Sequence, residues 1–240
     1  MDDITVKNKV DRAIIMAAGL GSRLLPITDI YAKPLVKVNG KRIIETLIDA
    51  LLRANIDDIT IIRGYKKEQF DCLLENYPFI KFIDNPDFDK ANNISSIYHA
   101  IDIVDNCYIC EADLLVNNPD VIQEYQNESN ILGFPTKKTD DWAFKVKDGL
   151  VYDYKLGNED CYQFYGITYW NSEDCKKLRE DIKDIYENFE NGHDYFWDNV
   201  PLQLKKENYK VHLRECKESD ICEIDSFDEL TAIDSSYLEN

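Results

Sequence analysis

One stretch of the sequence decides its fold: Ala13-Ile14-Ile15-Met16-Ala17-Ala18-Gly19-Leu20-Gly21-Ser22-Arg23-Leu24. Its apolar part, residues 13–18, is typical of a strand buried on both faces, as the central strands of parallel sheets are. The glycines that follow allow backbone N–H groups to turn toward an anion. A tight strand-to-helix turn would explain the same glycines. A dinucleotide fingerprint is excluded because position 24 is Leu, and no Gly-Lys-Ser/Thr follows for a P-loop.

Two cationic side chains stand close to this glycine loop in the sequence. Arg23 lies within it, and Lys33-Pro34-Leu35 follows ten residues later. A bare turn needs no cation, whereas a polyphosphate is stabilised by several. The pair therefore favours phosphate binding, with Arg23 and Lys33 as the candidate charged groups.

The apolar pattern alternates between strands and helices along the first half of the chain. It predicts strands at 59–62, 80–83 and 107–110, and helices at 42–55, 66–75, 93–104 and 119–127. This alternation is typical of a parallel, doubly wound sheet.

The pattern changes near residue 131. It predicts a hairpin at 142–156 that turns at Lys147-Asp148-Gly149, strands at 165–170, 209–213 and 221–224, and helices at 174–189, 196–206 and 227–233. No linker or repeat separates the two halves. We therefore expect a single domain over residues 1–240, with both halves on one continuous sheet.

The composition excludes several classes of partner. The chain has 28 Lys plus Arg and 46 Asp plus Glu, a formal net charge of −18, which argues against nucleic acid and anionic membranes. The hydrophobic fraction of 44% is too high for a disordered chain. The seven cysteines, an odd number, indicate reduced thiols and a cytoplasmic protein.

Carboxylates near strand ends are candidate metal ligands. Asp113 follows a predicted strand at the sheet edge where ligands of open α/β sheets bind. Glu223 and Asp225 lie two residues apart and share a face of a predicted strand. Mg²⁺ prefers such oxygen ligands together with phosphate oxygens. Alternatively, Asp113 caps a turn, and Asp225-Ser226 caps the last helix.

An aromatic cluster lies beside two further carboxylates. Its members are Trp142, Tyr195, Phe196 and Trp197, with Asp194 and Asp198 as neighbours. Aromatic faces bind quaternary ammonium groups by cation–π attraction, and adjacent carboxylates add charge complementarity. The alternative is that these residues belong to the hydrophobic core.

Asn92 and Asn93 could hydrogen-bond a base or a ribose, or one of them could cap the helix that begins near Ile94. None of the three histidines has a partner at the spacing of a catalytic triad or a metal site. We therefore assign catalysis to no histidine.

Together these residues resemble a known family. The string from Ala17 to Leu24, then Pro26 and Thr28, then Lys33-Pro34-Leu35, resembles the signature of nucleotidyltransferases that activate sugars or alcohols with nucleoside triphosphates. This family often has Pro before the Lys, where this chain has Ala32.

A narrower resemblance, to the bacterial CTP:phosphocholine cytidylyltransferases, spans most of the chain. It rests on Asn92-Asn93, Glu111-Ala112-Asp113, Trp142, Tyr195-Phe196-Trp197-Asp198-Asn199 and Glu223-Ile224-Asp225-Ser226.

The resemblance implies a Rossmann-like nucleotidyltransferase fold, a mixed and mostly parallel α/β sheet flanked by helices, with a small α+β acceptor-binding portion. Residues 12–130 would bind the nucleotide. Residues 131–240 would bind the acceptor and also supply metal ligands.

It also implies a site and a reaction. CMP would pass from CTP to phosphocholine with Mg²⁺ as cofactor, giving CDP-choline and pyrophosphate. The implied site residues are Arg23 and Lys33 for catalysis; Ala18, Gly19, Leu20, Gly21, Ser22, Asn92, Asn93 and Glu111 for the nucleotide; Trp142, Tyr195 (or Phe196), Trp197 and Asp198 for the acceptor; and Asp113, Glu223 and Asp225 for the metal.

Several alternatives stay open. The acceptor could be 2-aminoethylphosphonate, phosphoethanolamine or a sugar 1-phosphate, and the domain could instead be a catalytically silent, nucleotide-binding regulator. A monomer and a homodimer are both compatible with the sequence.

Overall fold

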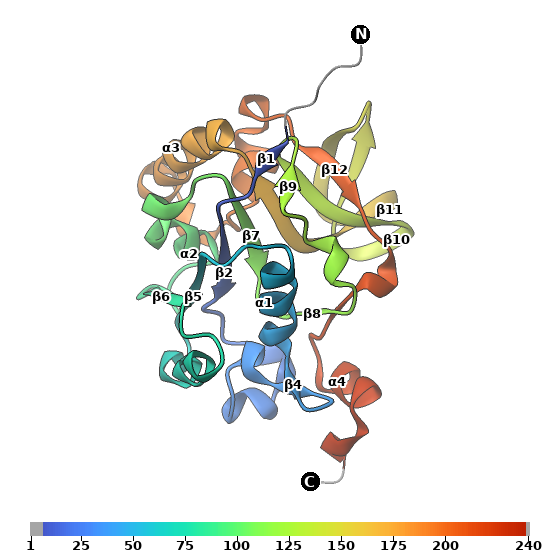
Figure 1. The fold of residues 1–240 in the computed structure, drawn as a ribbon. Helices are drawn as coiled ribbons and strands as arrows, with labels where there is room; N and C mark the ends of the chain where they lie inside the picture. The colour runs from blue at the N-terminus through green and yellow to red at the C-terminus, as the bar shows by residue number, and fades with distance from the viewer. Residues whose placement is uncertain (1–6, 239–240) are drawn as a thin grey trace.

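The computed structural model describes residues 7–238 and is built on one seven-stranded sheet (Figure 1). The strand order is β10-β12-β11-β7-β2-β5-β6. Strands β7, β2, β5 and β6 are parallel to one another, whereas β11 pairs antiparallel with β7. The sheet thus continues from the parallel half into the mixed half, and the predicted fold class, a mostly parallel sheet flanked by helices, is confirmed.

The described strands are β1 (Asn8–Lys9), β2 (Arg12–Ala17), β3 (Lys37–Val38), β4 (Lys41–Arg42), β5 (Ile59–Arg63), β6 (Lys81–Asp84), β7 (Cys107–Glu111), β8 (Leu114–Val116), β9 (Tyr125–Gln126), β10 (Asn130–Lys147), β11 (Leu150–Trp170), β12 (His212–Glu215) and β13 (Ile221–Glu223). The α-helices are α1 (Ile43–Arg53), α2 (Ile94–His99), α3 (Ser172–Asn188) and α4 (Phe227–Ile233). Short 3₁₀ helices include Ser22–Leu24, Lys33–Leu35 and Lys67–Glu75, and Val200–Leu204 forms a π-helix.

Strand β2 lies inside the sheet because both of its faces are apolar. Ala13, Ile15 and Ala17 belong to the core cluster on the side of α1. Ile14 and Met16 belong to the cluster formed with α2 and α3 on the opposite side. This alternation follows the two-residue period of a strand, and it leaves the glycine loop at the carboxyl end of β2.

Strands β10 and β11 form a long hairpin whose turn was predicted from the sequence. Lys147 pairs with Leu150, so Asp148 and Gly149 make a two-residue turn, and both have positive φ. Asp and Gly tolerate that conformation, as the tight hairpin turn requires.

The C-terminal segment packs against the segment that follows the glycine loop. Leu230 of α4 and Ile224 share a buried cluster with Leu24, Val36 and Ile43. Strand β13 pairs antiparallel with β8. In Figure 1, α4 lies at the foot of the molecule, near β4. These contacts bring residues 223–225 to the carboxyl edge of the parallel strands.

The predicted helix 66–75 is a 3₁₀ helix, Lys67–Glu75, and two further helix predictions were wrong. The segment 119–127 forms only a 3₁₀ turn, Pro119–Val121, because its end, β9, pairs with β1. The segment 196–206 begins as a turn, closed by the bond from the Phe196 N–H to the Asn199 side chain at 3.0 Å, and continues as the π-helix. In both places a local propensity is overridden by a hydrogen bond outside a regular helix.

All seven cysteines are free, as predicted. Among residues 7–238, no helix is both long and apolar enough to span a bilayer.

Candidate active site

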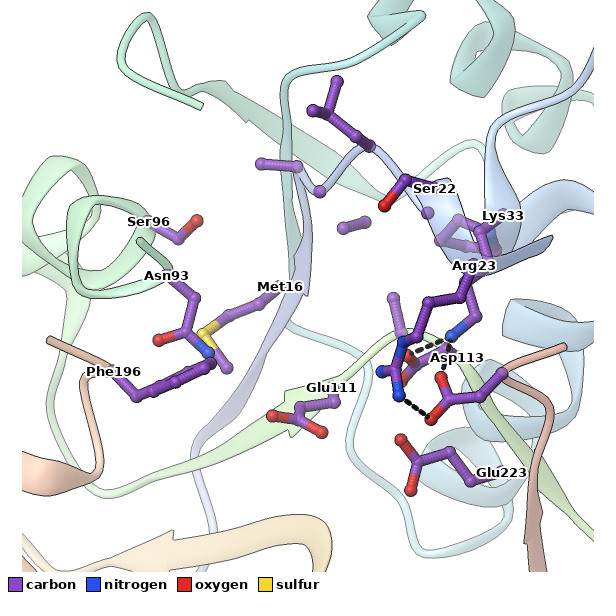
Figure 2. Close-up of a pocket in the computed structure, with 18 of the residues that line it drawn as sticks. Met16, Ser22, Arg23, Lys33, Asn93, Ser96, Glu111, Asp113, Phe196 and Glu223 are labelled. Atoms are coloured by element: carbon purple, nitrogen blue, oxygen red, sulfur yellow. Dashed lines mark hydrogen bonds and ion pairs between the residues drawn. The ribbon is translucent and has the colours of Figure 1, made fainter. Parts of the chain in front are cut away.

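A cavity of about 510 Å³ opens at the carboxyl ends of β2 and β7. Most of the predicted site residues line it, namely Ala18, Gly19, Leu20, Gly21, Ser22, Arg23, Lys33, Asn93, Glu111, Asp113, Trp142, Asp198, Glu223 and Asp225. Figure 2 shows Arg23 and Lys33 on the side of Asp113 and Glu223, and Asn93, Ser96 and Phe196 across the cavity from them.

The glycine loop is folded tightly onto Lys33. Gly21 has a φ of +65°, and a Cβ at this position would lie 2.9 Å from the Cβ of Lys33. The Thr28 hydroxyl donates to the carbonyl of Gly21 at 3.1 Å. Only glycine combines this backbone conformation with so close a neighbour, so the loop and the lysine form one packed unit.

Lys33 joins two of the predicted metal ligands. Its Nζ donates to Asp113 Oδ2 at 2.8 Å and to Asp225 Oδ1 at 2.6 Å. Arg23 contacts the other oxygen of Asp225 at 2.8 Å, and its side chain is 71% exposed (Figure 2). The two carboxylates raise the pKa of Lys33 against the opposing effect of its burial. The lysine is therefore charged.

Three carboxylates converge beside this network. Oxygens of Glu111, Asp113 and Glu223 lie within 4.8 Å of one another. Burial, and then the charge of Asp113, raises the pKa of Glu223 to about 8, and the pKa of Glu111 is raised for the same reasons. Gly166 of β11 makes room for Glu111, since a Cβ there would lie 2.6 Å from its Oε2.

The cluster fits a divalent cation. Its donors are carboxylate oxygens, and Asp113 Oδ1 is buried without a hydrogen-bond partner among the described residues. The grouping differs from the predicted one: Glu111, assigned to the nucleotide, joins Asp113 and Glu223, whereas Asp225 pairs with Lys33 and Arg23.

Asn93 is at the N-cap of α2, and its side chain makes no cap hydrogen bond, whereas Asn92 Oδ1 accepts the N–H of Asn93 at 2.8 Å. Asn93 lines the cavity and accepts the Trp197 N–H at 2.9 Å. Asn92 does not line it. Its N–H donates to the His193 carbonyl at 2.7 Å, and its side chain to the Asp194 carbonyl.

The aromatic cage is not assembled as expected. Trp142 and Phe196 line the cavity, with ring centroids 5.5 Å apart at 69°. Trp197 is 1% exposed, packs edge-on against Trp170 in the core and does not line the cavity; neither does Tyr195. The turn 196–199 directs neighbouring side chains to different sides, so Phe196 takes the place proposed for Trp197.

A buried carboxylate lies beside these rings. The Tyr154 hydroxyl donates to Asp198 Oδ2, while Asp198 Oδ1 is buried without a partner in the described part of the chain. Burial raises the pKa of Asp198 to about 6. Tyr154 stacks on Trp142 with ring centroids 5.0 Å apart, so one face of the indole is already covered.

Sequence reasoning missed several lining residues, among them Phe88, Ser96, Leu156 and Phe164. A signal for Phe88 was present: it follows β6, whose carboxyl end lies at the same sheet edge as that of β2. Leu156 pairs with Trp142 across the hairpin, a register that only the structure supplies.

The fold and the lining of this cavity define a class of protein, and comparisons of the sequence with known proteins identify that class. The family model described as nucleotidyl transferase matches residues 12–147. A 2-aminoethylphosphonate cytidylyltransferase of Lancefieldella rimae is 38% identical over 94% of this chain and 93% of its own length. A choline-phosphate cytidylyltransferase of Streptococcus pneumoniae is 33% identical over 90% of this chain and 93% of its own.

Comparison with solved structures also finds nucleotidyltransferases. The CTP:phosphocholine cytidylyltransferase from Streptococcus pneumoniae superimposes with a TM-score of 0.87 at 30% identity, over 94% of this chain and 98% of that one. An inositol-1-phosphate CTP transferase from T. maritima, 15% identical with a TM-score of 0.72, shares the fold.

The chain belongs to the nucleotidyl transferase family. Within it, the chain is similar over nearly its full length to bacterial cytidylyltransferases. These relatives are named for different acceptors, so the likeness indicates the class of reaction and leaves the acceptor to the chemistry of the cavity.

Proposed function

We propose that this protein transfers CMP from CTP to a small aminoalkyl phosphonate or phosphate that carries a primary ammonium group, such as 2-aminoethylphosphonate or phosphoethanolamine. The observation that carries the choice of acceptor is the buried Asp198 beside Trp142 and Phe196, together with the burial of Trp197 in the core.

Primary and quaternary ammonium groups are bound by proteins in different ways. A primary ammonium donates three hydrogen bonds and needs oxygen acceptors, whereas a trimethylammonium donates none and is held by aromatic faces. Asp198 has an oxygen without a partner, and Asp141, at the same cavity, is exposed. Tyr154 already covers one face of Trp142, whereas Asp198 and Asp141 bring carboxylate oxygens to the cavity.

The nucleophile in this reaction is an oxygen of the acceptor's phosphonate or phosphate group. A phosphate monoester, with a second pKa of ~6, is already mostly dianionic at pH 7 and needs no general base. This agrees with the cavity, because none of the three histidines lines it. The new bond forms between this oxygen and the α-phosphorus of CTP, and the bond to pyrophosphate breaks.

The cationic residues would reduce the repulsion between the two anionic substrates. Arg23 is exposed enough to turn from Asp225 toward the triphosphate and the departing pyrophosphate. Lys33, fixed by its packing against Gly21, would stabilise the charge that develops at the transferred phosphorus. The backbone of residues 18–22 would hold the nucleotide, with Asn93 on the opposite wall.

Asp113, Glu223 and either Glu111 or Asp225 would hold Mg²⁺, which when bound neutralises phosphate charge and aligns an in-line displacement. The orphaned Asp113 Oδ1 supports this placement.

A second acceptor, phosphocholine, is favoured by Trp142 and Phe196 at the cavity and by the likeness to choline-phosphate cytidylyltransferase of Streptococcus pneumoniae in sequence and in structure. The carboxylates also attract a quaternary cation, so it is the runner-up.

The test is a pyrophosphate-release assay with CTP, UTP, ATP and dTTP against 2-aminoethylphosphonate, phosphoethanolamine, phosphocholine and glucose 1-phosphate. We expect turnover with CTP and a primary-ammonium acceptor. Asp198→Asn should raise the KM for that acceptor about tenfold, the order of one hydrogen bond to a charged group, and leave the KM for CTP nearly unchanged. A preference for phosphocholine would overturn the choice of acceptor. No release with any pair would favour a silent regulatory domain.

A further inference from the structure

The loop 85–93, between β6 and α2, forms one wall of the cavity. Phe88 and Asn93 of this loop line it. Phe88 packs directly on Gly64, where an added Cβ would lie 2.6 Å from the Cβ of Phe88 and 2.8 Å from the carbonyl oxygen of Ala18. The position of this loop therefore sets the space beside the start of the glycine loop.

Asp87 anchors the loop from outside the cavity. Its Oδ2 interacts with His99 Nε2 at 2.7 Å and accepts the Tyr186 hydroxyl at 3.2 Å. His99 is the last residue of α2, and Tyr186 lies near the end of α3. One carboxylate oxygen thus joins the loop to both helices, and none of these three side chains lines the cavity.

Asn93, at the end of the loop, depends on the position of the loop. Asn93 Oδ1 accepts the Trp197 N–H, and because a backbone N–H can only donate, the amide nitrogen of Asn93 is left to face another group. That nitrogen is a donor, so its partner in the cavity must be an acceptor, such as a carbonyl of a base or a ribose oxygen. A shift of the loop would move this donor and the ring of Phe88 together.

We propose that Asp87 is a positioning residue for the nucleotide, which holds Phe88 and Asn93 at their places beside Ala18 and Gly19. This inference rests on the proposed function, in which the cavity binds CTP. The hydrogen bond from His99 lowers the pKa of Asp87, so the anchor is charged at neutral pH.

The first test compares two carboxylates of the same loop. Asp87→Ala removes the anchor, whereas Asp89→Ala removes an exposed carboxylate of equal charge two residues further on. In the free protein, we expect faster hydrogen exchange at the amides of residues 90–92 in Asp87→Ala alone. We also expect its KM for CTP to rise about tenfold, the order of a lost hydrogen bond to a charge, with a smaller change in kcat. Asp87→Asn, which keeps an acceptor oxygen, should recover part of both effects.

A second pair of variants tests the same role if Asp87→Ala fails to fold. Tyr186 and Tyr98 stack on each other at 4.2 Å, and the Tyr98 hydroxyl donates to Glu187 across the same α2–α3 interface. Tyr186→Phe removes the bond to the loop, and Tyr98→Phe removes a bond that does not reach it. Only Tyr186→Phe should loosen residues 90–92 and raise the KM for CTP.

The outcomes separate the two proposals. Unchanged exchange in Asp87→Ala and Tyr186→Phe, or faster exchange without a change in the KM for CTP, would overturn the positioning role. If the wild type neither binds nor turns over CTP, the proposed function fails, while the exchange data still decide whether Asp87 anchors the loop.

Discussion

Asp198, the carboxyl that we propose to bind the acceptor, also affects stability. It is 4% exposed, it accepts the Tyr154 hydroxyl, and its other oxygen has no partner among the described residues. Burial outweighs that hydrogen bond and raises its pKa from 3.8 to about 6. The folded protein therefore binds this proton more tightly than the unfolded chain does.

The sign of the resulting pH dependence follows from linkage. Between about pH 4 and pH 6 the folded state holds more protons at this position, so its contribution to the free energy of unfolding falls as the pH rises, by at most ~3 kcal/mol. Asp198→Asn removes this titration. Denaturant unfolding of both proteins at pH 4 and pH 7 should therefore show the variant gaining stability relative to the wild type as the pH rises. A difference that stays constant over this range would contradict the assigned pKa.

At the scale of elements, α4 holds Asp225 in place. Leu230 is the buried residue of this short helix and belongs to the cluster that includes Leu24 and Val36. Ser226 caps the helix by accepting the Glu229 N–H at 3.2 Å, and Asp225 lies just before it. Docking of α4 thus carries Asp225 to Lys33.

Truncating Leu230 should therefore loosen the site without unfolding the domain. We expect Leu230→Ala to cost about 2 kcal/mol in the docking of α4, the lower end for a buried leucine. Amide exchange should accelerate in residues 227–233, and pyrophosphate release should fall by about tenfold or more, as expected when charged groups move from their productive positions. Leu238→Ala, at a residue 67% exposed, is the control. Equal behaviour of the two variants would mean that α4 does not position Asp225.

The sequence predicted elements best where the signal was local. The turn at Asp148-Gly149 and strand β2 depend on their own residues and lie as predicted. The helix predicted over 119–127 was wrong because β9, at its end, pairs with β1, a distant part of the chain. The helix predicted over 93–104 ends at His99, where Ala100 leaves the α region (φ −99°, ψ 10°).

The same distinction holds for the candidate site. Arg23, Lys33 and the glycines form one local motif, and the structure brings them together. The grouping of Glu111 with Asp113 and Glu223 requires Gly166 of β11, which no spacing relates to β7. The choice between Phe196 and Trp197 depends on a single turn, so the aromatic composition alone could not settle which ring meets the cavity.

For the whole molecule, the formal net charge of −18 opposes the approach of anionic substrates. The cavity concentrates this problem, because the carboxyl groups of Glu111, Asp113, Glu223 and Asp225 all line it. Lys33 pairs with Asp113 and Asp225, and Arg23 pairs with Asp225. A divalent cation at the cluster would relieve the repulsion.

Mg²⁺ should therefore raise the Tm of the free protein by more than ionic screening alone would. At a hundredfold excess over its Kd a bound ion contributes about 2.7 kcal/mol, or roughly 5–10 °C in Tm for a domain of this size. Sodium chloride at matched ionic strength should give a smaller shift. Glu223→Gln should abolish most of the difference between the Tm shifts with the two salts, whereas Glu75→Gln, at an exposed position, should keep this difference. Equal shifts with both salts would argue against a metal site.

The pairing of β13 with β8 has a consequence for biosynthesis. The glycine loop, Lys33 and Asp113 leave the ribosome before Glu223 and Asp225, which lie far downstream of them in the sequence. A nascent chain that has folded its parallel strands still lacks two of the carboxylates at the cavity. The site therefore becomes complete only after β13 has been made, and stalled or truncated products that end before β13 should be catalytically silent even when most of the sheet has formed.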